Sequence, residues 1–115
     1  MNNALATHAA VTEQSTRLLI ASTILEQLGG VRRLSVMTGA RDFVALPDGV
    51  QFKIGAGAKL GANKARIILT PEDVYTVEFW KIRGAKCELI SISNYIYNDM
   101  LSRVFEQETG FSLTL

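Results

Sequence analysis

The chain has 115 residues, of which 48% are hydrophobic and 20% are charged, a balance typical of one globular domain and unlike that of a disordered chain. Twelve Lys and Arg against eleven Asp and Glu leave a formal charge of +1, which gives no global electrostatic reason to expect a nucleic-acid duplex as partner. The single cysteine excludes an internal disulfide framework and fits a reducing cytoplasm. Since no apolar run approaches the length of a membrane span and the first residues lack the pattern of a secretion signal, we expect a cytoplasmic protein without membrane contact.

A helix is predicted near the N-terminus. Thr12 can cap it, and apolar residues such as Leu18 and Leu25 then recur at helical spacing. Gly29 and Gly30 end the helix, because glycine adopts the left-handed conformation that closes many helices.

Two matching turns, residues 38–41 and 83–86, are each flanked by runs that are typical of strands. Gly39 and Gly84 occupy the first central position, where a two-residue type II′ hairpin needs a positive φ. The strands that we predict are residues 31–38, 41–46, 50–54 and 66–70, followed by a long hairpin over residues 74–93.

The second turn predicts a definite register for the long hairpin. The expected pairs are Ile82 with Cys87, Lys81 with Glu88, Trp80 with Leu89, Phe79 with Ile90 and Val77 with Ile92. Because side chains alternate along a strand, Phe79 is expected in the core, whereas Trp80 and its neighbour Glu78 lie on the outer face.

The rest of the chain supplies one loop and one helix. Residues 55–63 are interrupted by small residues and have no apolar period, so we predict a flexible loop. A second helix is predicted from Ser93 or Asn94, and Gly110 ends it. Its two apolar rows are Ile96, Met100 and Val104, and Tyr97, Leu101 and Phe105.

The predicted order is helix, about six strands, helix. This order favours an α+β fold, with a mainly antiparallel, twisted sheet of about five to six strands flanked by an N-terminal and a C-terminal helix. Residues 1–11 are expected to form a mobile arm, and residues 12–115 a single domain.

No catalytic constellation is recognisable in the sequence. The one histidine, His8, lies in the expected arm, and nothing near Cys87 in the sequence would activate its thiol. We therefore expect a protein that is not an enzyme and has no catalytic, cofactor-binding or metal-binding residues. An enzyme without a familiar motif stays an open alternative.

One candidate binding site lies on the second hairpin. An outer Trp80 beside the carboxylate of Glu78 suits a protein interface better than a polyanion, because Glu78 would repel phosphate. Arg83, close to the turn, completes this candidate partner-binding set.

A second candidate site surrounds the glycine-rich segment 55–61. This segment lacks the Gly-Lys-Ser/Thr ending of a nucleoside-triphosphate loop. It is nevertheless accompanied by basic residues that could contact phosphates if they converge: Lys53, Lys59, Lys64 and Arg66.

Several runs together resemble a family of small, largely uncharacterised proteins encoded by bacteriophages and related mobile elements. They include Met-Thr-Gly-Ala at positions 37–40, and they are residues 24–30, 37–44, 77–79, 81–84 and 104–110. The resemblance implies no catalytic or cofactor residue. A short phage protein without enzyme chemistry commonly binds something in the host cell, including components of immunity systems such as CRISPR effectors.

The leading hypothesis is therefore a phage-encoded, non-enzymatic protein that inhibits a host protein, most notably a defence factor, in the host cytoplasm; it is an anti-CRISPR candidate. The alternative is a binder of single-stranded nucleic acid or of a small nucleotide through the basic glycine-rich loop. A homo-oligomer could also form by pairing of an unprotected edge strand.

Overall fold

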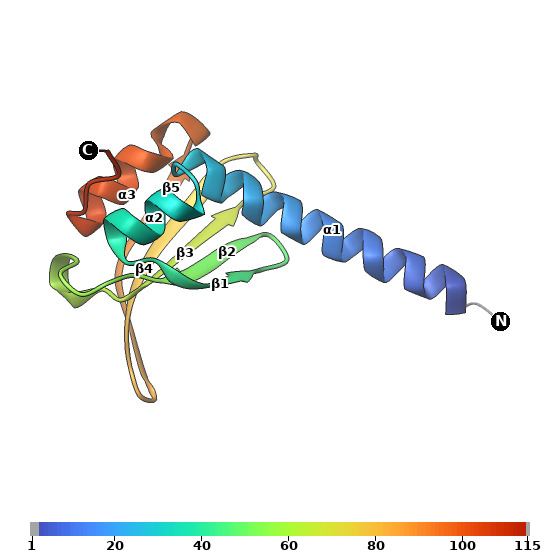
Figure 1. Cartoon of the computed structure of the whole chain (residues 1–115), viewed down its shortest axis with the longest axis horizontal. Helices are drawn as coiled ribbons and strands as arrows, with labels where there is room; N and C mark the ends of the chain where they lie inside the picture. The colour runs from blue at the N-terminus through green and yellow to red at the C-terminus, as the bar shows by residue number, and fades with distance from the viewer. Residues whose placement is uncertain (1–2, 115) are drawn as a thin grey trace.

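The computed structural model describes residues 3–114, with side chains described from residue 14 onward. Five strands form one antiparallel sheet in the order β1-β2-β3-β4-β5, and three helices cover one of its faces (Figure 1). The strands are β1 Arg41–Ala45, β2 Gly49–Lys53, β3 Lys64–Leu69, β4 Tyr75–Arg83 and β5 Lys86–Ile96. The helices are α1 Asn3–Gln27, α2 Val31–Thr38 and α3 Leu101–Thr109, with short 3-10 turns at Lys59–Gly61 and Asn98–Met100. The predicted α+β fold is confirmed.

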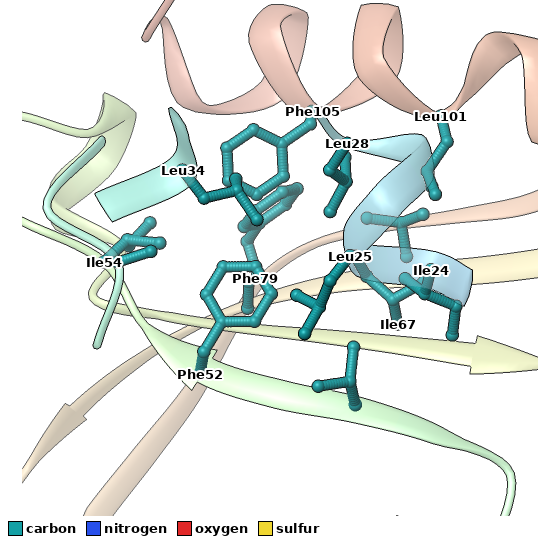
Figure 2. Packing of buried hydrophobic residues seen from close by; sticks show 14 of the residues in the cluster. Ile24, Leu25, Leu28, Leu34, Phe52, Ile54, Ile67, Phe79, Leu101 and Phe105 are labelled. Atoms are coloured by element: carbon teal, nitrogen blue, oxygen red, sulfur yellow. The ribbon is translucent and has the colours of Figure 1, made fainter. Parts of the chain in front are cut away.

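The core lies between the helices and the covered face of the sheet (Figure 2). Phe105 of α3 sits at its centre, with ring centroids 6.1 Å from Phe52 of β2 and 5.4 Å from Phe79 of β4. Alternate strand residues point toward the helices, and Leu28 and Leu34 close the core from α1 and α2. The intervening strand residues must therefore face away from the helices.

The first helix is longer than predicted. It begins at Asn3 rather than at Thr12, so that residues 3–11, expected as a mobile arm, are helical. This stretch lacks a clear apolar period, but it contains four alanines and neither glycine nor proline, so its helix propensity is high. The side chain of His8 lies outside the described part of the chain.

The first Gly-Ala turn is not a hairpin, and that prediction is wrong. Residues 31–38 form α2, which Gly39 closes at φ 71° with its N–H donating to the carbonyl of Ser35 at 3.0 Å. Three β-branched residues favour a strand locally, but Leu34 and Thr38, one helical turn apart, are both buried. Burial at helical spacing therefore outweighs the strand propensity. The positive φ predicted for Gly39 is confirmed, with a helix end as its cause.

The second Gly-Ala turn is a hairpin, as predicted. Gly84 has φ 57°, and Ala85 is not among the residues with positive φ, as a type II′ turn requires. The three predicted pairs nearest the turn are confirmed: Ile82 with Cys87, Lys81 with Glu88 and Trp80 with Leu89.

The register changes further from the turn. A β-bulge at Ile90 places Phe79 opposite Ser91 rather than Ile90, and Ile92 opposite Glu78 rather than Val77. The extra residue shifts the rest of β5 by one position, which moves Ile92 to the outer face. The predicted pairs of Phe79 and Val77 are therefore wrong.

The C-terminal helix begins later than predicted. β5 continues to Ile96, and the hydroxyl of Thr76 donates to the side-chain oxygen of Asn94 at 3.2 Å across the sheet. After a 3-10 turn, α3 begins at Leu101 and ends at Thr109, and Gly110 caps it with φ 80°, as expected for a left-handed cap. Continued pairing with β4 thus displaces the helix start from Ser93 or Asn94.

Gly39 and Gly84 give a matched pair of stability tests. A Cβ at Gly39 would lie 2.9 Å from the Cα of Gly55, whereas one at Gly84 would meet nothing within 4 Å. We expect Gly84→Ala to cost about 1–2 kcal/mol through left-handed strain alone, and Gly39→Ala to cost more because backbone must also shift. Urea denaturation measures both losses. Equal losses would contradict the close approach of the α2 cap to residue 55.

Candidate functional site

The face of the sheet opposite the helices is open (Figure 1), and strand register sorts its side chains into rows. Each row takes one residue from each strand, in the order β1 to β5. The first row is Arg41, Lys53, Lys64, Trp80 and Leu89. The second row is Val44, Gln51, Arg66, Glu78 and Ile92.

The β4–β5 side of the open face is apolar. Leu89 and Ile92 are 43% and 49% exposed, and Trp80 and Ile82 are half-buried beside them. We call Trp80, Ile82, Leu89 and Ile92 the apolar strip. The indole N–H of Trp80 donates to a carboxylate oxygen of Glu78 at 2.9 Å, which ties the first row to the second.

The β1–β3 side of the open face is basic. Arg41, Lys53 and Lys64 stand directly opposite one another on three neighbouring strands, and Arg66 follows in the second row. We call these four residues the basic strip. Within residues 14–114 its one ion pair joins Lys53 to Asp42 at 3.2 Å. Like charges directly opposite each other destabilise a sheet, so this arrangement opposes folding unless an anion balances it.

Charge is therefore segregated even though the whole chain is nearly neutral. The open face and the β4–β5 hairpin, which projects beyond the sheet (Figure 1), carry seven of the twelve basic residues and three of the eleven acidic ones. Besides the basic strip these are Lys81, Arg83 and Lys86, against Asp42, Glu78 and Glu88. The formal charge of this region is thus +4, whereas that of the chain is +1.

The predicted phosphate-contacting residues are only partly brought together. Lys53, Lys64 and Arg66 share the open face, but Lys59 donates from its ammonium to the backbone carbonyl of Gln107 at 2.8 Å. Lys59 therefore interacts with the negative C-terminal end of α3 and does not join the other three cations on the open face. Sequence reasoning missed Arg41, which it placed where the first turn meets the strand 41–46, because the pairing of Arg41 with Lys53 was not predicted.

The predicted partner-binding residues are also divided. Glu78 and Trp80 are joined by a hydrogen bond on the open face, whereas Arg83 lies exposed near the end of the hairpin. Sequence reasoning missed the outward position of Ile92, since no local signal marks the bulge that displaces it.

A hollow of about 270 Å³ lies at one end of the open face, lined by Arg41, Lys53, Asn63, Lys64 and Ile82. Two hydrogen bonds join the side-chain amide of Asn63 to the backbone of Ile82. The Nδ2 atom donates to the Ile82 carbonyl at 2.8 Å, and the Oδ1 atom accepts from the Ile82 N–H at 2.9 Å. The Asn63 side chain thus extends the β3–β4 pairing to the residue before β3, and its two hydrogen bonds hold it in place.

The remaining features of the described residues do not indicate a second polar site. A groove of about 490 Å³ beside α2 is mainly apolar and is lined by Arg33, Val36 and Leu113 among others. Burial raises the pKa of the Tyr75 hydroxyl, Gln27 lowers it and Asp73 raises it, but Tyr75 faces the core. The described residues hold no cluster of three His, Cys, Asp or Glu side chains that could bind a metal, and none of their helices could cross a membrane.

Both edges of the sheet are irregular. The pairing of β1 with β2 shifts after Arg41, where Asp42 has φ 56°, and β5 carries its bulge at Ile90 and a second irregularity near Tyr95, which has φ 57°. Bulges of this kind interrupt the row of unpaired backbone groups that an added strand would need. Self-association through an edge strand stays a prediction, and these edges do not favour it.

Comparison of the chain with protein-family models, with curated proteins and with solved structures found no match. The resemblance to phage proteins therefore stays a prediction. The function of the chain is inferred from the chemistry of its open face.

Proposed function

We propose that this chain is a non-enzymatic binding protein that holds and blocks a protein partner on its open face. The observation that carries the proposal is the apolar strip. Single exposed apolar residues are common on protein surfaces, but Trp80, Leu89 and Ile92 are neighbours across two strands and form a continuous patch. Tryptophan at the centre of such a patch is typical of the residues that dominate binding energy.

The surroundings of the apolar strip indicate the chemistry of the partner. Lys64 stands directly opposite Trp80, and the whole region has an excess of positive charge. A partner with acidic residues around an apolar patch would match both properties, and complementary charge would speed its association. The carboxylate of Glu78, which accepts a hydrogen bond from Trp80, lies within this binding surface and would repel a polyanion.

The identity of the partner rests on the resemblance to phage proteins. That resemblance supports a host protein as target, such as a component of a CRISPR system or another defence factor, and a place of action in the host cytoplasm. Because the open face carries an excess of positive charge, we expect such a target to present an acidic surface.

Two substitutions test the use of the apolar strip. Ile92 and Val44 occupy opposite ends of the second row and are 49% and 47% exposed, so they form a matched pair. We expect Ile92→Ser to weaken partner binding by about 2 kcal/mol or more, about 30-fold in Kd, because it removes an exposed apolar contact of the strip beside Trp80. Val44→Ser should change the affinity little.

The measurement begins with capture of a partner from host lysate by the tagged chain and its identification by mass spectrometry. Titration of the purified partner with the wild type and both variants follows. Equal affinities of the two variants, or recovery of nucleic acid alone, would overturn the proposal.

A second candidate function is the binding of single-stranded nucleic acid or of a small nucleotide. The first row favours it, because three basic residues lead directly to Trp80, so that phosphates could follow the basic residues while a base stacks on the indole. Two features weigh against it. Glu78 places a carboxylate beside the ring, and the aliphatic Leu89 and Ile92 offer no stacking surface.

Salt dependence tests this second function. If a single strand lies along the basic strip, the affinity should fall steeply with salt, and Lys64→Gln should reduce the slope of log K against log salt by about 0.7. Arg103→Gln, an exposed cation of α3 on the helical side, should leave the slope unchanged. Fluorescence anisotropy of a labelled oligonucleotide at several salt concentrations gives both slopes. Absence of binding at low salt would exclude this function.

A further inference from the structure

We propose that the hollow between Arg41, Lys53 and Lys64 binds a phosphate group, supplied either as inorganic phosphate or as a phosphomonoester. The inference comes from the positions of three cations around one space, and it holds whether or not a protein partner binds the apolar strip.

Strand register creates the site. Arg41 pairs with Lys53, and Lys53 pairs with Lys64, so that the three side chains leave neighbouring strands at one level of the sheet. Directly opposed residues of antiparallel strands have Cβ atoms only about 4.5–5.5 Å apart. A single small anion can therefore contact more than one of the three cationic groups.

The charge balance of the hollow favours a dianion. Among the described residues, the one ion pair of these cations joins the ammonium of Lys53 to the carboxylate of Asp42 at 3.2 Å. That pair is more than half exposed, with side-chain exposures of 53% and 61%, so water screens it strongly. Three cations and one carboxylate leave a formal charge of +2, which a phosphate dianion matches and a single carboxylate does not.

The donor types also suit a tetrahedral oxyanion. Arg41 presents a planar fork of N–H groups, while the two lysines contribute point charges with freely rotating donors. One guanidinium nitrogen of Arg41 donates to the carbonyl of Gly39 at 3.3 Å, which restricts the orientation of the fork. Groups that are positioned before binding lose less entropy when the ligand arrives.

Asn63 and Ile82 complete the lining of the hollow. Asn63 is fixed by its two hydrogen bonds to the backbone of Ile82, and the Ile82 side chain borders the hollow. The volume of about 270 Å³ exceeds that of a phosphate group alone, so the group can bind together with ordered water or with part of a larger molecule. Trp80, directly opposite Lys64, stands next to the site.

Thermal unfolding of the full chain in phosphate and in chloride at equal ionic strength is the first test. The melting temperature of the wild type should rise with phosphate concentration, because a ligand that binds only the folded state stabilises it. Phosphate also stabilises proteins through exclusion from their surface, so Arg103→Gln serves as the control and should show the same rise as the wild type.

Lys64→Gln should behave differently in two respects. In chloride it should melt at or above the temperature of the wild type, because it relieves repulsion between opposed cations. In phosphate it should lose the part of the rise that depends on binding. An equal phosphate-dependent rise in the wild type and in Lys64→Gln would overturn the proposal.

Tryptophan emission gives a second test that does not depend on unfolding. Trp80 is the one tryptophan of the chain, so its emission reports on this region alone. Titration with inorganic phosphate at constant ionic strength should give a saturable change that Lys64→Gln weakens at least tenfold. A change that does not saturate, or that is equal in the variant, would overturn the site.

A parallel titration with a nucleoside monophosphate distinguishes the sources of the phosphate. Tighter binding than inorganic phosphate would indicate a phosphomonoester whose base contacts Trp80, and equal binding would indicate that the phosphate group alone is recognised. Binding of a protein partner to the apolar strip is tested separately, with Ile92→Ser. Failure of the phosphate site is therefore distinguishable from failure of the proposed protein-binding function.

Discussion

The packing of Phe105 against Phe52 and Phe79 is the interaction on which the rest of the structure depends. It joins α3 to the second and fourth strands and so determines which face of the sheet the helices cover. Truncation of a buried phenylalanine costs about 3–5 kcal/mol, a large share of the 5–15 kcal/mol that holds a typical domain together. Because side chains alternate along every strand, this covered face also determines which residues remain on the open one.

The bulge at Ile90 has a similar consequence for the open face. With a regular register Ile92 would pair with Val77 and point toward the core, so that the outer side of β5 would keep Leu89 but lose Ile92. The extra residue instead carries Ile92 to the second row, beside Trp80 and Leu89. Bulges occur often beside functional sites because they re-aim side chains, and the apolar strip owes its continuity to this one.

The parts of the fold that were predictable from sequence are those with local causes. Gly84 and the residues next to it carry the chemistry of a two-residue hairpin, so the turn and its three nearest pairs could be predicted. Residues 31–38 could not, since a short segment that mixes apolar and polar residues fits a strand or a helix and tertiary burial decides between them. The basic row was equally hidden, because Arg41 and Lys64 are far apart in sequence and meet only through Lys53.

The phosphate hollow and the apolar strip share the first row, so their ligands must influence each other. Lys64 borders the hollow and stands directly opposite Trp80, at the centre of the strip. A dianion bound beside Lys64 lowers the positive potential that would attract an acidic partner. An acidic partner, in turn, neutralises the positive charge that would bind the dianion. Linkage requires the two effects to be equal in free energy, so each ligand weakens the other by the same factor. The row of opposed cations, which costs the free protein stability, is thus the element through which the two surfaces are coupled.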